Sequence, residues 1–192
     1  MFEAAAKWLQ KPGAVGVIPT DTVYGLVARV ADQVSVARLY DLKKREAKPG
    51  TIIAASLEQL EDLGLKHRYL KVVEQFWPGA VSIVIPVADS ALEYLHQGQQ
   101  SLAVRLPVGA ELQQLLRQNG PLLTSSANQP GKPTAVTVEE AKKYFADKVD
   151  FYIDGGDLSG RQPSTIIRVV DDAIEVLRPG AMQLPGDDTI NP

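Results

Sequence analysis

Apolar residues recur along this chain in two alternating patterns, short continuous runs and longer stretches with helical spacing. Runs rich in Val, Ile and Leu are typical of buried strands, whereas apolar positions repeating every three or four residues indicate amphipathic helices. The runs predict strands over 14–18, 51–55, 81–87, 102–106, 122–124 and 149–153, and a hairpin that joins 165–170 to 173–177. The spaced stretches predict helices over 2–10, 33–43, 57–63, 69–76, 110–118 and 138–145.

Strands that alternate with helices predict an α/β fold, a single domain built around one mixed sheet. Residues 19–25 are expected to leave the sheet after the first strand, since Pro19 stiffens the exit and Gly25 allows close passage of backbone. Ligands of such sheets bind in crevices beside strand ends, which is where the polar segments of this chain lie.

At 192 residues the chain can form one domain with a substantial core. We expect residues 1–180 to form that domain and 181–192 to be a loose tail with little to bury. No run of about 18 apolar residues and no signal-peptide pattern occurs, so neither a membrane span nor a membrane partner is predicted. Cysteine is absent, which excludes disulfides, Cys-ligated zinc and thiol catalysis and is compatible with a cytoplasmic location.

The net charge of −3 disfavours tight non-specific binding of nucleic acid by the whole chain. Local charge differs, because five cations fall within eleven residues. They could complement the end of the preceding helix, or they could clamp phosphate groups. Charge alone leaves these two interpretations open. The five are Arg38, Lys43, Lys44, Arg45 and Lys48.

Three other polar positions also allow two interpretations. Thr20-Asp21-Thr22 can cap a turn or hold a ligand. Arg105 lies within an apolar run and therefore needs a carboxylate partner, either from the protein or from a substrate. Ser126-Ala127-Asn128 forms a polar loop after a strand, which on its own is weak evidence. No Gly-rich phosphate loop is present, and the two isolated histidines have no metal-ligand spacing, so no protein metal site is predicted.

Five motifs in order along the chain carry a family resemblance. They are Pro19-Thr20-Asp21-Thr22-Val23-Tyr24-Gly25-Leu26, the K-x-R of Lys43 and Arg45, the S-x-N of Ser126 and Asn128, Pro163-Ser164-Thr165-Ile166, and Leu177-Arg178-Pro179-Gly180. Together they resemble the YrdC-type threonylcarbamoyl-AMP synthases, in their short bacterial form. Lys48 comes one residue earlier than in the family's K-x-R-x-x-x-K pattern, so the resemblance assigns it no role.

The resemblance implies a twisted mixed sheet with a cationic concave pocket. It also implies that L-threonine, bicarbonate or CO2, and ATP give threonylcarbamoyl-AMP and pyrophosphate. Mg²⁺ would arrive with ATP, and no organic cofactor is expected. The product would pass to a tRNA threonylcarbamoyl transferase complex, and contact with tRNA is compatible with that role. The alternative is a module of the same fold that binds double-stranded RNA or tRNA without turnover.

The resemblance also implies roles for individual residues. Catalysis would involve Lys43, Arg45, Ser126 and Asn128. Threonine would contact Thr22, Tyr24, Arg105, Ser126 and Ser164. ATP would contact Lys43, Arg45, Ser101, Asn128, Thr134 and Arg178. No nucleophile–base pair is visible in the sequence, so we expect no covalent enzyme intermediate.

Overall fold

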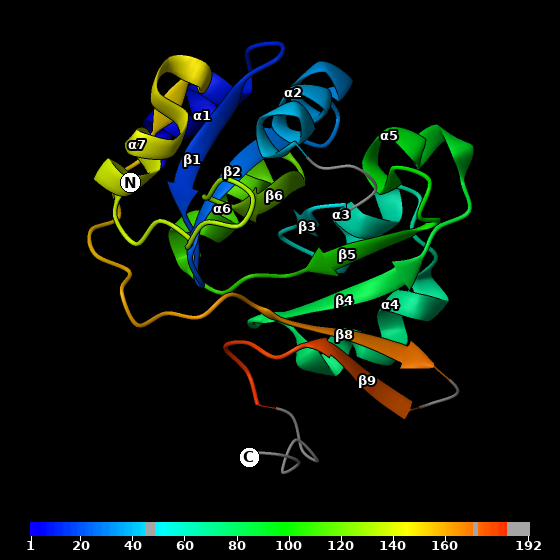
Figure 1. Cartoon of the computed structure of the whole chain (residues 1–192). Helices are drawn as coiled ribbons and strands as arrows, with labels where there is room; N and C mark the ends of the chain where they lie inside the picture. The colour runs from blue at the N-terminus through cyan, green and yellow to red at the C-terminus, as the bar shows by residue number, and fades with distance from the viewer. Residues whose placement is uncertain (45–48, 171–172, 184–192) are drawn as a thin grey trace.

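A computed structural model of the chain describes residues 1–44, 49–170 and 173–183. Within these residues nine strands form one sheet in the order β7-β1-β2-β6-β3-β5-β4-β8-β9 (Figure 1). The pairs β1–β7, β3–β5 and β4–β8 are parallel and the others antiparallel, which confirms the predicted mixed sheet. The strands are β1 (Val15–Pro19), β2 (Tyr24–Arg29), β3 (Thr51–Ile53), β4 (Val81–Pro86), β5 (Ser101–Arg105), β6 (Leu122–Ser126), β7 (Phe151–Tyr152), β8 (Thr165–Val170) and β9 (Ala173–Arg178).

Side chains that cap a helix start explain several helix boundaries. Asp32 accepts hydrogen bonds from two backbone amides of the first turn of α2, and Ser56 and Thr137 each accept one at α3 and α7. The predicted helices lie close to their observed ranges, except that the predicted 69–76 helix starts earlier and ends in a 3₁₀ turn. The short helix Glu93–His96 was not predicted. The helices are α1 (Glu3–Leu9), α2 (Gln33–Lys43), α3 (Leu57–Asp62), α4 (His67–Val73), α5 (Glu93–His96), α6 (Ala110–Asn119) and α7 (Val138–Phe145), with 3₁₀ turns at Glu74–Phe76, Ser90–Leu92 and Ala146–Lys148.

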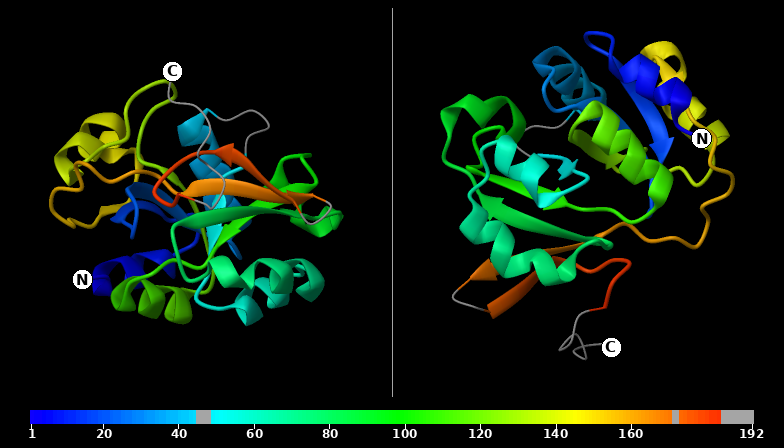
Figure 2. Two further views of the ribbon diagram at one scale, coloured as in Figure 1. Left: turned by 90° about the horizontal axis from the view of Figure 1, so that it is seen from below. Right: turned by 180° about the vertical axis from the view of Figure 1, so that it is seen from behind.

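Helices cover both faces of the sheet, and the alternation of side chains along each strand produces two cores. Ile18 and Val27 pack on one face with residues of α1 and α6. Val17 and Leu26 point to the opposite face, where they belong to a cluster that includes residues of α2 and α7. In Figure 2, α1, α6, α3 and α4 lie along the same side of the sheet. Burial of both faces explains why the strands appear in the sequence as continuous apolar runs.

The expectation that residues 19–25 leave the sheet is correct only for residues 20–23. Pro19 pairs with Tyr24, and Thr20 N donates to Val23 O at 3.2 Å, so this segment is a hairpin turn between β1 and β2. The following strand is almost completely buried and pairs on its other side with β6. The segment therefore brings its polar tip to the sheet edge while both its flanks remain in the sheet.

Part of the predicted loose tail is attached to the domain. Ala181 N donates to Pro163 O at 2.8 Å, and Thr165 Oγ1 donates to Met182 O at 2.6 Å. The chain is thus fixed beside the entry to β8 at least through Met182. Residues 184–192 and the predicted turn at 171–172 lie outside the described residues. None of the described helices is both long enough and apolar enough to cross a membrane.

Candidate active site

A polar cavity opens where the β1–β2 turn, the start of β3, the ends of β5 and β6, and the entry to β8 meet. Its enclosed volume is about 120 Å³. Five of the residues predicted for the site line it: Thr22, Arg105, Ser126, Ser164 and Arg178. The other lining residues are Thr20, Val23, Gly25, Pro49, Gly50, Thr51, Ala103, Thr124, Ser125, Pro163 and Ile166.

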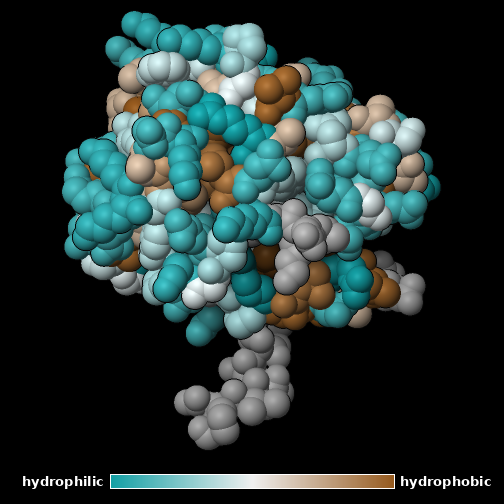
Figure 3. Space-filling model, turned by 45° about the horizontal axis from the view of Figure 1, so that its top comes forward, coloured by the Kyte–Doolittle hydropathy of each residue, from teal (hydrophilic) through white to brown (hydrophobic). Residues whose placement is uncertain are grey.

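This cavity differs from the rest of the hydrophilic surface because several of the polar side chains that line it are buried. The surface seen in Figure 3 is mostly hydrophilic, so exposed polar residues alone would not locate a site. Thr20, Thr22, Arg105, Thr124 and Ser164 are all buried and line the cavity. Burying such groups is costly unless they have partners, so their shared location indicates a binding surface.

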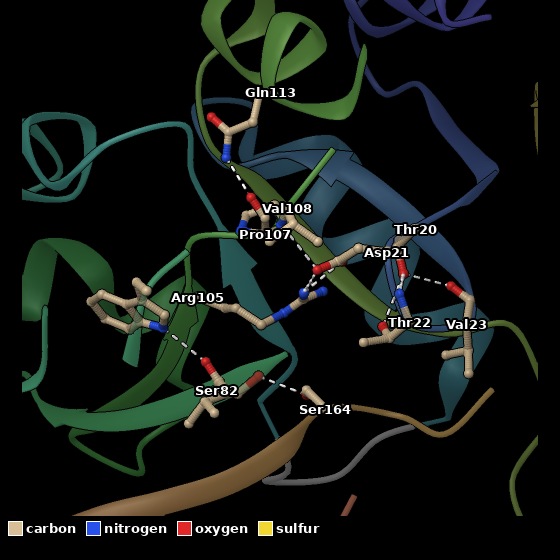
Figure 4. Close-up of polar contacts among 12 residues, drawn as sticks. Thr20, Asp21, Thr22, Val23, Ser82, Arg105, Pro107, Val108, Gln113 and Ser164 are labelled. Carbon is tan, nitrogen blue, oxygen red and sulfur yellow. Dashed lines mark hydrogen bonds and ion pairs between the residues drawn. The ribbon is translucent and has the colours of Figure 1, made fainter. Parts of the chain in front are cut away.

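Arg105 has the carboxylate partner that its apolar strand requires. Its Nη1 donates to both carboxylate oxygens of Asp21, at 2.6 and 2.7 Å, and the two side chains are only 3% and 4% exposed (Figure 4). Asp21 Oδ2 also accepts from Val108 N at 3.1 Å. The ion pair therefore fixes the β1–β2 turn against the end of β5. Asp21 belongs to the first of the five motifs, but no sequence pattern indicates that it pairs with a residue so distant.

The two threonines beside Asp21 stabilise the turn and also line the cavity. Thr20 Oγ1 donates to Val23 O at 2.7 Å, accepts from Thr22 N at 3.2 Å, and lies 3.0 Å from Thr22 Oγ1 (Figure 4). The turn interpretation is confirmed for Thr20. Thr22 lines the cavity as well, so here the two interpretations of the motif do not exclude each other.

Across the cavity, Ser164 is held by two neighbours. Its Oγ lies 2.8 Å from Ser82 Oγ, and Arg178 Nη2 donates to its carbonyl oxygen at 2.7 Å. Ser82 is fully buried and was not predicted as part of the site, although a lone serine in the apolar run 81–87 was a visible signal. Arg178 is the last residue of β9, so the strand end supplies a cation beside this hydroxyl pair.

Lys43 holds the polar loop that follows β6. Its Nζ donates to Ser126 O at 2.8 Å, to Asn128 O at 2.6 Å and to Asn128 Oδ1 at 2.8 Å, and the residue is 3% exposed. Ser126 Oγ donates to the same Asn128 Oδ1 at 2.7 Å. The three predicted residues thus form one partly buried network, in which the buried ammonium group adds positive charge to the loop.

Two glycines keep the bottom of the cavity open. A Cβ atom on Gly25 would lie 2.6 Å from Thr124 Oγ1, and one on Gly50 would lie 2.7 Å from Thr124 O. Both distances are shorter than real Cβ contacts. Only glycine allows the backbone to approach Thr124 this closely, so these positions determine the depth of the cavity.

Five predicted site residues of the described part lie outside the cavity lining: Lys43 and Asn128 of the network above, and Tyr24, Ser101 and Thr134. Tyr24 OH donates to Gly156 O at 2.9 Å and accepts from Gly155 N at 2.8 Å, and burial raises the pKa of its phenol. Ser101 is at the opposite end of β5 from Arg105, about 13 Å away along the strand. Thr134 is brought back beside the β6 loop by the bond from Ala135 N to Ala127 O.

Arg45 and Lys48 lie outside the described residues, so the structure does not place either of them. Among the residues that the structure describes, no group of three or more His, Cys, Asp or Glu side chains could hold a metal ion.

Comparison with known proteins identifies the family. The sequence profile of the Sua5/YciO/YrdC family, described as "Telomere recombination", matches residues 9–180. The chain belongs to this family. It is 33% identical over 169 residues to the threonylcarbamoyl-AMP synthase of Pseudomonas paraeruginosa, covering 86% of this chain and 90% of the relative.

Two solved structures of the family have the same fold. Sua5 of Pyrococcus abyssi, complexed with L-threonine, has a TM-score of 0.81 at 32% identity, covering 92% of this chain and 53% of that protein. YciO of E. coli has a TM-score of 0.80 at 25% identity, covering 94% and 89%. This chain therefore spans nearly all of YciO but only about half of the longer Sua5.

Proposed function

We propose that this chain is a threonylcarbamoyl-AMP synthase, which forms threonylcarbamoyl-AMP and pyrophosphate from L-threonine, bicarbonate and ATP. The observation that carries the proposal is the match over 92% of the chain to a Sua5 structure that contains L-threonine. The Pseudomonas paraeruginosa relative, 90% of which is covered by the match, is a threonylcarbamoyl-AMP synthase. The cavity supports the assignment, because it combines two arginines with several hydroxyl groups.

Threonine is proposed to bind on the Arg105 side of the cavity. A guanidinium group binds carboxylates with good geometry, and Arg105 is fixed in place by Asp21. The hydroxyls of Thr22 and Ser164 line the same cavity and can hydrogen-bond the polar groups of the amino acid.

ATP is proposed to bind along the Ser126–Asn128 loop. The Lys43 ammonium donates hydrogen bonds to this loop, and Arg178 lies at the edge of the cavity, so both can offset phosphate charge. We propose that Mg²⁺ enters on the triphosphate, because magnesium is commonly bound through substrate phosphates and water. The proposed ATP contacts of Arg45, Ser101 and Thr134 remain predictions.

The chemistry follows from holding these groups together. The threonine amine and bicarbonate condense to a carbamate with loss of water. A carbamate oxygen then attacks the α-phosphorus of ATP, forming the new P–O bond while the bond to pyrophosphate breaks. Such transfers depend mainly on positioning and on electrostatic stabilisation of developing charge. The chain's contribution is to orient the carbamate by Arg105 and to neutralise the phosphates.

The test is threonine-dependent turnover. Purified protein is incubated with ATP, Mg²⁺, labelled bicarbonate and L-threonine, and both pyrophosphate and a labelled adenylate are measured. We expect both products to require threonine. Pyrophosphate release that does not depend on threonine would refute the synthase. Salt-sensitive retention of RNA without turnover would instead support the rival binding module. As further proposals, the product passes to a tRNA threonylcarbamoyl transferase complex, and the reaction takes place in the cytoplasm.

A further inference from the structure

The ion pair between Asp21 and Arg105 leaves one edge of the guanidinium without a partner. Both carboxylate oxygens of Asp21 accept from the same nitrogen, Nη1. Nε of Arg105 is buried and makes no hydrogen bond within the described part of the chain. The hydrogen bonds of the guanidinium to described residues come from Nη1, not from Nη2. A buried donor without a partner is costly in a folded protein and calls for an explanation.

The unused edge has the geometry of a carboxylate receptor. The N–H groups of Nε and Nη2 point to the same side of the guanidinium and form a fork that binds a carboxylate through two parallel hydrogen bonds. Arg105 lines the cavity, so a ligand carboxylate can approach its guanidinium there. Nε has almost no accessible surface, so the second hydrogen bond of the fork requires a shift of the neighbouring side chains on binding. Asp21 contacts the other side and does not compete for it.

We propose that Asp21 is a positioning residue: by holding Nη1 of Arg105, it presents the Nε–Nη2 edge of the guanidinium to the carboxylate of the amino-acid substrate. This inference rests on the proposed function. Asp21 contacts no substrate in this scheme and acts through Arg105. An arginine side chain has several rotatable bonds, and holding it in one orientation before binding removes an entropic cost of binding.

Asp21 also has a structural role that the test must separate from positioning. Its Oδ2 accepts from Val108 N, and it joins two elements separated by 84 residues. A loss of stability alone would therefore not support the proposal. The useful readout is the affinity for threonine compared with the affinity for ATP.

The test compares Asp21→Asn with Asp21→Glu and with a matched control, Asp150→Asn. Asp150 also pairs with an arginine, Arg38, but no residue of that pair lines the cavity. We expect Asp21→Asn to raise the KM for threonine and the calorimetric Kd for L-threonine about 10- to 100-fold, the effect of losing a hydrogen bond to a charged group. The KM for ATP should stay within about twofold. Asp21→Glu should restore part of the threonine affinity, and Asp150→Asn should leave it unchanged.

The proposal is overturned if Asp21→Asn lowers Tm but leaves the threonine constants within about twofold of the parent, or if it raises the KM values of threonine and ATP equally. Binding of L-threonine is measured without ATP, so this result is independent of turnover. If the parent binds L-threonine but forms no adenylate, the proposed function fails while the positioning role can still be decided. If the parent does not bind L-threonine at all, both proposals fail.

Discussion

Replacing Lys43 by methionine tests whether its ammonium group organises the loop after β6. Methionine keeps a long apolar stem of similar size but removes the charge and all donors. The substitution leaves Ser126 O, Asn128 O and Asn128 Oδ1 without the donor that contacts them in the native protein. Ser126 Oγ would still donate to Asn128 Oδ1, so the loop would lose its anchor to α2 but not its internal bond.

The expected magnitude follows from these contacts. A hydrogen bond from a charged donor contributes about 1.5–3 kcal/mol, but removing a buried ammonium also removes its desolvation cost, and water can reach groups at the cavity edge. We therefore expect a net loss of about 3 kcal/mol in the free energy of unfolding. For a chain of this length that corresponds to a fall in Tm of about 6–12 °C.

The assay combines thermal unfolding with pyrophosphate release. Lys43→Met should lower Tm as stated and reduce threonine-dependent pyrophosphate release at least about tenfold at temperatures where the protein remains folded. Lys44→Met is the matched control, since Lys44 is the exposed neighbour at the end of α2 and should change neither quantity much. If Lys43→Met kept the parental Tm and rate, the ammonium would not be holding the loop and our account of the network would be wrong.

Three further substitutions probe other parts of the site. Gly25→Ala places a methyl group 2.6 Å from Thr124 Oγ1, so it should destabilise the protein by about 1–3 kcal/mol and weaken substrate binding, as denaturant unfolding and KM values would show. Arg178→Ala should raise the KM for ATP about tenfold or more with a smaller effect on threonine, and equal effects would contradict its placement beside the phosphates. Tyr24→Phe removes the donor to Gly156 O and should cost about 1–3 kcal/mol near neutral pH. Burial raises the pKa of the Tyr24 phenol above 10.0, so at high pH the folded protein keeps a proton that the unfolded chain releases. The stabilisation by Tyr24 should therefore decline as pH rises above 10. Urea unfolding should show a smaller difference in stability between parent and variant at pH 11 than at pH 9.

The pattern of apolar residues predicted most of the fold, because in most elements the residues that favour a helix or a strand are also the ones that the fold buries. The helix over 33–43 was predicted with its observed bounds from its apolar spacing, and the structure shows that Asp32 caps its start. The strand β2 was not predicted. Thr20, Asp21 and Gly25 are typical of a turn, and the apolar residues of β2 follow them directly, so the whole segment was interpreted as a turn. A tight hairpin explains both features, but the sequence does not show which residues pair across it.

Five of the residues predicted for the site line the cavity, but the contacts between them could not be predicted. The need of Arg105 for a carboxylate follows from its apolar surroundings, whereas the choice of Asp21 depends on how two distant strands meet. The same holds for Ser82 and Ser164, which come together only because β4 and β8 pair in parallel. The structure also showed that Lys43 faces the loop, which the charge pattern alone left open.

The strand pairing of β4 has a consequence for how the protein is made. Its neighbour β8 is synthesised only after about 80 more residues, so a growing chain exposes the unprotected edge of a Val- and Ile-rich strand throughout that interval. Exposed edges of this kind template aggregation. The ribosome must also release β9 before Arg178 can line the cavity. Nascent chains of this protein should therefore lack a complete cavity until residue 178 has left the ribosome.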